Sequence, residues 1–320
     1  MRKAVKIDTL KIGDYTLIHD GLSQGLIQAF CQCPRKFLFR INKWRKKKGK
    51  PGTLFGTIVH DVSDAVYSSG DSSLDFIDKC IDEVLTREGQ INDFGELQGA
   101  KAFAVLVAYC KYYASDQKDN KFGEPEEVFS VEFGTREIYA KRKGKIDGQF
   151  YPVKTDKLWL LEKKTMGRIY EDDLMIYLNM DFQSLFYVIA KEDISGESVK
   201  GVLYDVIRNP GLKLKKGESL LDYIDRISDD IQLRPEHYFM RLEVPFKESD
   251  KNYFVNEVQR KTKDIFFKIK ACEKDTPYKV FYRNQSACRG AFTCDFLEAC
   301  STGCLQGYEQ GDTIFPELEY

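Results

Sequence analysis

The stretch KIDGQFYPVKTDKLWLLEKK, residues 145–164, decides the fold because it places a turn between two strand-like runs. Its first seven and last seven residues have the composition of β-strands, and Pro152–Asp156 has the chemistry of a turn. A hairpin closed symmetrically about this turn pairs residues whose numbers sum to 309. The sequence therefore predicts that Asp147 lies directly opposite Glu162.

Two directly opposed carboxylates predict a metal site. Cβ atoms at such positions are about 5 Å apart, and like charges there destabilise a sheet. A shared divalent cation would offset the repulsion, and carboxylate oxygens suit Mg²⁺ or Mn²⁺. Lys164 shares a face with Glu162, where it could orient or deprotonate a water molecule or stabilise charge on a phosphate. Lys163 points away, so its backbone carbonyl is the group that could add a ligand.

A surface hairpin with Glu–Lys pairs across its strands is the alternative interpretation of these residues, since exposed charge pairs are common and weak. The apolar run from Leu158 to Leu161 argues against it. Apolar residues on both faces are typical of an inner strand rather than a polar edge. We therefore favour the metal site.

Three residues elsewhere in the chain could complete this site. His60 lies on a predicted helix, off its apolar stripe, where a neutral imidazole could join the metal ligands. A surface imidazole near Asp64 is the alternative for this residue. Gln183 and Tyr187 are four residues apart on a later predicted helix, beside its apolar face. They are either groups that line the cleft or ordinary boundary residues.

The order of the predicted elements indicates an α/β protein in which helices come first and a mixed sheet flanked by helices follows. The chain has 320 residues, 42% of them hydrophobic and 31% charged, which is typical of a globular protein. The predicted helices are Ser23–Phe30, Pro34–Trp44, Thr53–Tyr67, Leu74–Thr86, Leu97–Tyr113, Phe182–Lys191 and Glu248–Cys272. The predicted strands are Tyr15–His19, Val128–Phe133, Lys145–Tyr151, Leu158–Lys164, Gly201–Arg208 and Tyr238–Val244.

We predict three parts: a mostly helical portion over residues 1–125 that carries Cys33 and His60, a core over residues 126–272, and a cysteine-rich segment over residues 273–320 that packs on the first part. The apolar stretches are too short to span a bilayer, and the first residues lack the apolar centre of a signal peptide. We therefore expect a cytoplasmic protein that does not contact membranes.

The net charge of −1 gives no hint of nucleic acid, but the charge is unevenly spread. Lys43–Lys50 holds six basic residues in eight positions. Such a run alone is as often a solvated surface as a functional one. It becomes a candidate for phosphate contacts if a nuclease site lies nearby.

Nine cysteines are many for a reducing compartment, where structural disulfides are rare. Four of them fall within seventeen residues, from Cys288 to Cys304, which indicates a shared metal centre rather than free buried thiols. Four thiolates can hold a 4Fe–4S cluster or zinc. Structural zinc usually shows short paired spacings, and none occurs here.

Several short motifs now stand in a recognisable order: CPRKF (33–37), GTIVH (56–60), KIDG (145–148), LEKKT (161–165), QSLFY (183–187) and the C-terminal cysteines. In this order the chain resembles the RecB-like, iron–sulfur branch of the PD-(D/E)XK nuclease superfamily, the type of AddB and of the nuclease of CRISPR adaptation. The resemblance implies a restriction-endonuclease-like core with a C-terminal iron–sulfur segment. It also implies metal-dependent hydrolysis of DNA, commonly as an exonuclease, in recombination, repair, viral DNA processing or CRISPR adaptation.

The resemblance assigns roles to the candidate residues. It implies His60, Asp147 and Glu162 as metal ligands, with Lys164 as the catalytic lysine. Gln183 and Tyr187 match its glutamine–tyrosine helix. It implies that a 4Fe–4S cluster is held by Cys33, Cys288, Cys294 and Cys300. The interval between Cys288 and Cys294 is longer than the family's, so Cys31 and Cys304 stay open as ligands.

The expected partner is DNA, single-stranded or with free ends. The sequence contains no G-x-x-x-x-G-K-[ST] motif, so any helicase motor would be a separate partner, as would a recombination or CRISPR protein. Because the resembling family includes rings, a homo-oligomer is possible. Two other functions remain open: a catalytically silent iron–sulfur scaffold that binds DNA, and an RNA nuclease of the same fold.

Overall fold

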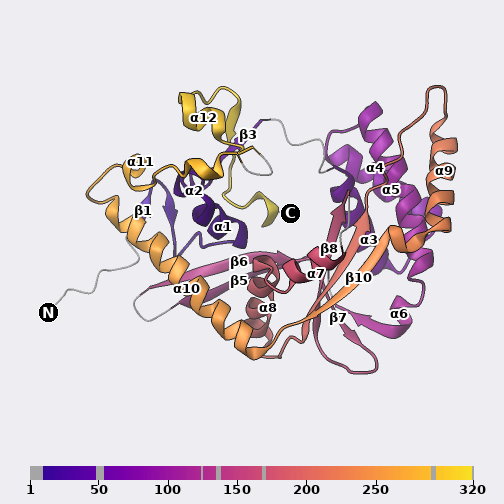
Figure 1. Ribbon diagram of the computed structural model, residues 1–320, viewed down its shortest axis with the longest axis horizontal. Coiled ribbons are helices and arrows are strands. Elements are labelled where there is room, and N and C mark those ends of the chain that lie inside the picture. Colours follow the sequence, from indigo (N-terminus) through magenta and orange to yellow (C-terminus); the bar gives the residue numbers. More distant parts are fainter. Residues whose placement is uncertain are drawn as a thin grey trace.

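The computed structural model describes residues 10–47, 54–123, 125–134, 138–167, 171–289 and 293–318. A five-stranded mixed sheet lies at its centre, in the order β10–β9–β8–β7–β4 (Figure 1). Only β8 and β9 are parallel neighbours. The strands of this sheet are β4 (Asn120–Phe122), β7 (Gly148–Pro152), β8 (Trp159–Met166), β9 (Gly201–Arg208) and β10 (Phe239–Pro245).

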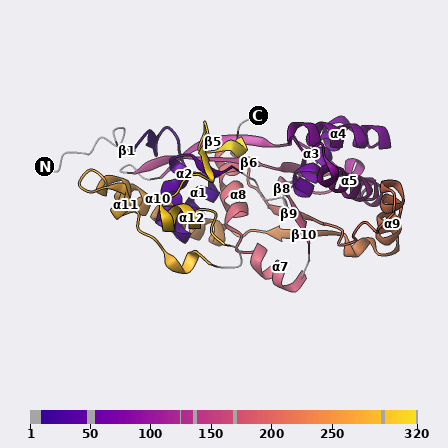
Figure 2. The ribbon, with the colours of Figure 1, turned by 90° about the horizontal axis from the view of Figure 1, so that it is seen from above.

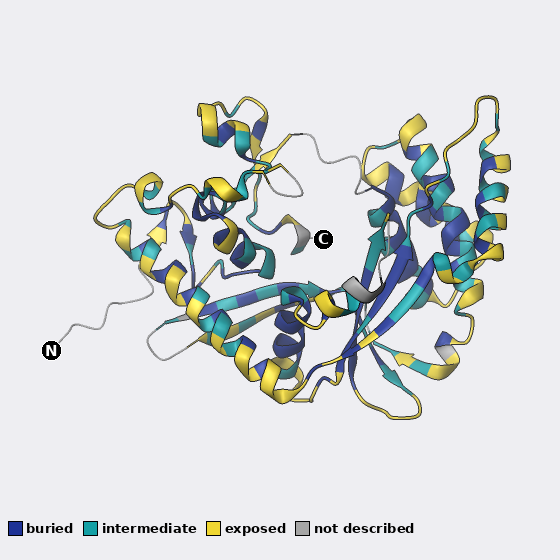
Figure 3. Cartoon of the chain, viewed as in Figure 1, coloured by how far each residue is buried: buried dark blue, intermediate teal, exposed yellow. Residues whose placement is uncertain are grey.

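The hairpin formed by β7 and β8 has the predicted register. Gly148 pairs with Leu161 and Phe150 with Trp159, so the residue numbers sum to 309. β8 has a neighbour on each side and is buried along most of its length, as is β9 (Figure 3). The prediction of an inner strand is therefore confirmed.

The strand predicted over Lys145–Tyr151 is instead two strands that meet at Asp147. β5 (Glu127–Gly134) and β6 (Tyr139–Ile146) form a separate antiparallel ribbon, and β6 runs into β7 with only this residue between them. The backbone carbonyl of Asp147 accepts from the N–H of Glu126 at 3.1 Å, and Glu126 has a φ of 54°. This bend lets one continuous run of sequence serve two sheets.

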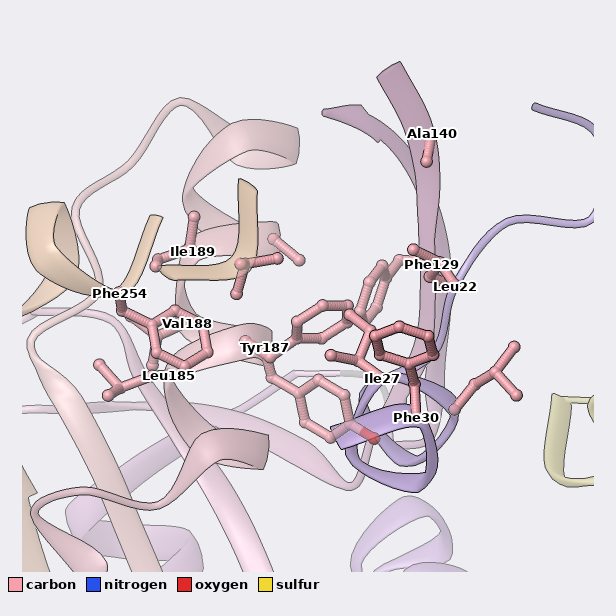
Figure 4. Packing of buried hydrophobic residues seen from close by; sticks show 14 of the residues in the cluster. Leu22, Ile27, Phe30, Phe129, Ala140, Leu185, Tyr187, Val188, Ile189 and Phe254 are labelled. Atoms are coloured by element: carbon pink, nitrogen blue, oxygen red, sulfur yellow. The ribbon is translucent and has the colours of Figure 1, made fainter. Parts of the chain in front are cut away.

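One face of the sheet and the β5–β6 ribbon are covered by α1 (Gln24–Gln32), α2 (Pro34–Ile41), α8 (Phe182–Ser195) and α10 (Glu248–Ala271). Ser23 caps α1, as predicted, by accepting from the N–H of Leu26 at 3.2 Å. Figure 4 shows the core between these elements, with Tyr187 projecting from α8 toward Ile27 and Phe30 of α1.

A second core lies on the other face of the sheet. It is built by α3 (Leu54–Ser69), α4 (Leu74–Arg87), α5 (Asp93–Tyr112) and α9 (Leu220–Leu233), which gather at one end of the molecule (Figures 1 and 2). The helices predicted for these segments of the N-terminal portion are confirmed, within a few residues at their ends. The central sheet therefore separates α1 and α2 from α3, α4 and α5.

The C-terminal segment packs against the early elements. β11 (Tyr308–Gln310) pairs with β3 (Trp44–Lys46), and the guanidinium of Arg35 on α2 donates to the carbonyl of Phe281 at 2.8 Å. The helix predicted to reach Trp44 ends at Ile41 because Lys43, with a φ of 62°, turns the chain into β3. The domain boundaries themselves stay a prediction.

The remaining elements are short. The strand predicted over Tyr15–His19 is reduced to the two residues of β2. No helix in the described ranges has both the length and the apolar character needed to cross a membrane. The short elements are β1 (Lys11–Ile12), β2 (Tyr15–Thr16), α6 (Asp116–Asp119), α7 (Glu171–Leu178), α11 (Pro277–Val280) and α12 (Leu297–Thr302).

Candidate active site

The carboxylate of Asp147 is fixed at the bend between β6 and β7. Its Oδ2 accepts from the backbone N–H of Lys163 at 3.0 Å, across the hairpin. The same oxygen lies 3.8 Å from Nδ1 of His60 on α3. The structure therefore brings the predicted histidine and the first predicted carboxylate together.

Glu162 lies beside them on β8, with its side chain only 5% exposed. Its Oε1 accepts from the ammonium of Lys164 and from Nε2 of Gln183, the latter at 2.8 Å. Lys164 also lies 3.5 Å from Oε1 of Gln183. The three side chains form one hydrogen-bonded group that joins β8 to α8.

The electrostatics of this group follow from its burial and from its close charges. Burial, helped by the charge of Asp147, raises the pKa of Glu162 to about 8, against the opposing effect of Lys164. Burial alone would lower the pKa of Lys164, but the charges of Glu162 and Asp147 outweigh it and raise that pKa. Lys164 is therefore a stable cation at neutral pH.

Burial lowers the pKa of His60, and the neighbouring lysines add to this effect, although Asp147 opposes it. A neutral imidazole with a free ring nitrogen is a normal ligand of divalent cations. The donor set of His60, Asp147 and Glu162 thus fits a Mg²⁺ or Mn²⁺ ion in its chemistry. In the parts of the chain that the structure describes, no group of three or more His, Cys, Asp or Glu residues is arranged so that it could hold a metal ion. Glu162 is bonded to Lys164 instead.

The position of α3 depends on a close approach at Gly56. A Cβ atom at this residue would lie 2.8 Å from Oγ1 of Thr165, the residue after Lys164 on β8. A larger residue here would push against the side chain of Thr165, so glycine suits the close approach of the first turn of α3 to the strand. His60 follows one turn later on the same helix, which brings its ring to Asp147.

The comparisons with known proteins bear on this arrangement. The sequence model of the PD-(D/E)XK nuclease superfamily matches residues 21–301, which is most of the chain. The chain belongs to the PD-(D/E)XK nuclease superfamily. Its mixed sheet flanked by helices is consistent with that fold, and membership indicates a nuclease-type function that involves nucleic acid. The iron–sulfur branch stays a prediction.

The other two comparisons add little. The search of curated proteins found no match. A solved structure described as "Crystal structure of SSO0001" is 13% identical, over 65% of this chain and 73% of that chain, with a TM-score of 0.26. At that TM-score the likeness carries no argument.

Tyr187 lies deeper in this nuclease than Gln183 does. Its side chain packs in the core of Figure 4, and its ring lies over Gly144, where a Cβ atom would be 2.7 Å from the ring. Gln183 contacts Glu162 directly, whereas Tyr187 supports the β6 strand that leads to Asp147. Its predicted part in catalysis stays a prediction.

The sequence analysis missed the role of the Lys163 side chain. The Lys163 side chain is 2% exposed, and its ammonium donates to the carboxylate of Asp64 on α3. This contact lies on the face of β8 opposite the one that carries Glu162. Burial raises the pKa of Asp64 to about 6, although Lys163 opposes that rise. Successive side chains of a strand point to opposite faces, so Lys163 on an inner strand points into a core, where a lysine requires an acidic partner. The sequence could therefore have predicted a buried acidic partner for Lys163. Asp64 is four residues after His60, on the same side of α3.

A further buried polar network lies behind the nuclease site. The guanidinium of Arg241 on β10 donates to both carboxylate oxygens of Asp116, at 2.8 and 2.7 Å, and to Asp205 at 3.1 Å. It also donates to the hydroxyls of Tyr109 and Tyr67, at 2.8 and 3.2 Å. These contacts join β9 and β10 to α3, α5 and α6, so they hold the helical end of the molecule against the sheet.

The predicted cluster cysteines lie in one region of the molecule, near α2 and α12, but within the described residues they are not grouped as a metal site. Sγ of Cys33 accepts from the N–H of Asn284 at 3.3 Å, and the carbonyl of Cys288 accepts from the N–H of Cys294 at 3.1 Å. Burial raises the pKa of Cys300; nearby arginines oppose this rise, and Cys33 and Cys288 add to it. Thiols have the chemistry to hold a 4Fe–4S cluster or a zinc ion, so the cluster stays a prediction.

The two alternative cysteines lie elsewhere. Burial raises the pKa of Cys31, and the charges that act on it belong to Lys261, Glu257 and Asp264 of α10. Cys304 follows α12 and is exposed. Whether either of them replaces one of the four predicted ligands stays open.

Proposed function

We propose that this chain is a Mg²⁺- or Mn²⁺-dependent deoxyribonuclease that cleaves DNA, single-stranded or with free ends, as an exonuclease. The observation that carries the proposal is a group of side chains at the end of the β7–β8 hairpin. Lys164 is bonded to Glu162, His60 lies beside Asp147, and the charge of Asp147 acts on Glu162. Two carboxylates, one imidazole and one amine in this arrangement suit hydrolysis of a phosphodiester.

In the proposed mechanism, His60, Asp147 and Glu162 would hold the metal ion, together with the backbone carbonyl of Lys163. When bound, the metal supplies a Lewis acid for the phosphate and lowers the pKa of a water molecule. The ammonium of Lys164 contacts the phosphate oxygens and stabilises the charge that builds there. Gln183 donates to one oxygen of Glu162 and would keep that carboxylate in a fixed orientation.

The same proposal includes a 4Fe–4S cluster on Cys33, Cys288, Cys294 and Cys300. Its role is to tie the C-terminal segment to α2 across a very long loop. The chain would act in the cytoplasm in recombination, repair, viral DNA processing or CRISPR adaptation, with a separate helicase or recombination protein, and as a monomer or a ring.

Lys164→Ala tests the catalytic proposal. End-labelled single- and double-stranded DNA is incubated anaerobically with Mg²⁺ or Mn²⁺ and wild-type chain, Lys164→Ala or the exposed control Lys121→Ala. We expect cleavage by the wild type and the control and none by Lys164→Ala, because the phosphate loses its cation. Undiminished cleavage by Lys164→Ala rejects the assignment.

Two other functions are separated by the same assay. A labelled RNA of matched sequence is digested alongside the DNA, and faster cleavage of RNA would favour the RNA nuclease. Failure of the wild type to cleave either polymer with any metal would favour the silent scaffold. The complete set of Asp147, Glu162 and Lys164 is the observation that argues against a scaffold.

A further inference from the structure

A cavity of about 160 Å³ lies at the carboxyl ends of β8 and β9, and the name strand-end cavity is used for it below. These two strands are the parallel neighbours of the central sheet. In open α/β sheets, ligands commonly bind outside the carboxyl ends of parallel strands. The lining includes Gly167, Arg208, Gly211, Arg234 and His237.

Two basic side chains face each other in the strand-end cavity. Nη1 of Arg208 lies 3.1 Å from Nδ1 of His237. Because a guanidinium nitrogen only donates, Nδ1 accepts and the ring proton is on Nε2. No carboxylate pairs with Arg208 within the described ranges. A guanidinium that meets a second base instead of a carboxylate has donors left for an anion.

A second arginine and two backbone amides add to this lining. Arg234 donates to both carboxylate oxygens of Asp230, at 3.0 and 2.8 Å, so these two charges offset each other and that of Arg208 is left over. A Cβ atom at Gly167 or Gly211 would meet no other atom within 4 Å, so the backbone is open there. Neither glycine N–H donates to a backbone carbonyl of the described residues. The lining therefore offers several unused donors.

These donors suit a phosphate monoester dianion. The terminal oxygens of a phosphoryl group accept from several directions, and a guanidinium, an imidazole N–H and backbone amides can meet them together. Pockets for drug-sized ligands begin at about 300 Å³, so this cavity holds a phosphoryl group and not a whole nucleotide. The basic run predicted over Lys43–Lys50 is not part of the lining, and its last three residues lie outside the described part.

We propose that the strand-end cavity binds a phosphate monoester through Arg208, His237 and Arg234. The proposal goes beyond the proposed nuclease function and does not depend on cleavage. Two kinds of molecule carry this group in the same form: a polynucleotide strand that ends in a phosphate, and a free mononucleotide. In both, the phosphoryl group enters the cavity while the sugar and the base stay outside.

Histidine-ring NMR on the full chain tests binding in the absence of cleavage. The chain has three histidines, so selective labelling of this residue gives few signals, and His237→Asn identifies one of them. Inorganic phosphate is titrated at pH 7 in EDTA and at constant ionic strength, with sodium chloride as the reference salt. We expect the signals of His237 to shift to saturation, and those of the exposed His19 to stay unchanged.

Two variants test the arginines separately. Arg208→Gln and Arg234→Gln should each raise the Kd for phosphate about tenfold, because each removes hydrogen bonds between charged groups. Arg260→Gln is the matched control, since it makes the same change at an exposed position of α10, and it should change Kd less than about twofold. Circular dichroism checks the fold, and either cavity variant decides the point if the other does not fold.

Binding should also raise the pKa of His237. Burial and the charges of Arg208 and Arg234 lower this pKa in the free protein, against the opposing effect of Asp230 and of Glu236 in the same turn. A bound dianion offsets the two arginines and favours the protonated ring. The midpoint of the His237 titration should therefore rise at saturating phosphate, and the rise should be smaller in Arg208→Gln at the same phosphate concentration.

Nucleotides separate the two sources of the phosphate monoester. Thymidine 5′- and 3′-monophosphates are compared with oligo(dT) of equal length that carries a 5′-phosphate, a 3′-phosphate or neither. Tighter binding of a phosphorylated strand, with the difference lost in Arg208→Gln, assigns the cavity to strand ends. Binding of a mononucleotide without a difference between the strands assigns it to free mononucleotides.

Three results would overturn the proposal: signals of His237 that do not move with phosphate, an equal shift with sodium chloride, or an unchanged Kd in both arginine variants. Because no divalent metal is present, none of these results bears on cleavage. Lys164→Ala tests the proposed nuclease function separately, so the two proposals can fail independently.

Discussion

Lys163 and Asp64 form a buried ion pair on the face of β8 opposite Glu162. The pair links α3 to β8, and the backbone N–H of the same lysine donates to Asp147 at 3.0 Å. One residue therefore fixes the helix that carries His60 and the carboxylate beside it. The middle residue of the E-x-K strand supports the geometry of the site through its own side chain.

Removal of one member of this pair should destabilise the chain more than removal of both. Lys163→Met leaves Asp64 buried without a cation, and we expect a loss of about 3 kcal/mol in the free energy of unfolding at pH 7. The double variant Lys163→Met/Asp64→Leu should recover most of it, because no charge stays buried. Urea unfolding measures the free energy of unfolding of the wild type, the single variant and the double variant. Lys79→Met is an exposed control that should cost less than about 0.5 kcal/mol.

The loss in Lys163→Met should shrink as the pH falls. Burial already raises the pKa of Asp64 to about 6, above its unfolded value, and loss of the lysine raises it further. A buried carboxylate with a raised pKa destabilises the fold at high pH, and the penalty disappears as pH falls through the folded pKa. Urea unfolding at pH 8 and pH 5 should therefore show a smaller difference from wild type at pH 5. A constant difference would contradict this prediction.

The close approach of Gly56 to Thr165 leads to a prediction about cleavage activity. Gly56→Ala should reduce cleavage about ten- to hundredfold with the fold intact, because the new Cβ displaces α3 and moves His60 from Asp147. Thr165→Ala removes the oxygen that the Cβ would meet, so Gly56→Ala/Thr165→Ala should recover activity. Gly56→Ala/Thr165→Val should not recover it. Cleavage rates are measured for the four variants, and circular dichroism checks that each one is folded. Full activity in the single variant Gly56→Ala would contradict this prediction.

The β7–β8 hairpin could be predicted from sequence because its turn residues and the period-two alternation act locally. The register of this hairpin, in which the numbers of paired residues sum to 309, followed from the turn alone. The bend at Asp147 could not be predicted, because it depends on the β5–β6 ribbon packing against α1 and α8, which are distant in sequence.

The partners of site residues were harder to predict than the residues themselves. Gln183 bonds to Glu162 only because α8 packs against the sheet, and Asp64 meets Lys163 only because α3 crosses its other face. Motif order along the chain says nothing of such contacts.

The raised pKa of Glu162 predicts that metal binding depends on pH. Because burial raises the pKa of this carboxyl to about 8, a divalent cation that binds it at lower pH displaces a proton to solvent. We expect the affinity for Mg²⁺ to rise between pH 6 and pH 8.5, approaching tenfold per pH unit at the acidic end. Isothermal titration calorimetry in buffers of different ionisation enthalpy measures both Kd and proton release. Glu162→Gln should abolish the proton release, and an affinity independent of pH would contradict the prediction.

The cysteine arrangement predicts which substitutions remove the proposed cluster. Protein purified anaerobically should be brown, with broad absorbance near about 400 nm. Cys300→Ser should lose this band, and it should also lower the thermal midpoint, because the C-terminal segment is then no longer tied to α2 through Cys33. Cys31→Ser and Cys304→Ser are matched controls that should keep both the colour and the midpoint, since Cys31 faces α10 and Cys304 is exposed. Colourless wild-type protein with one equivalent of zinc would assign the four thiols to zinc instead.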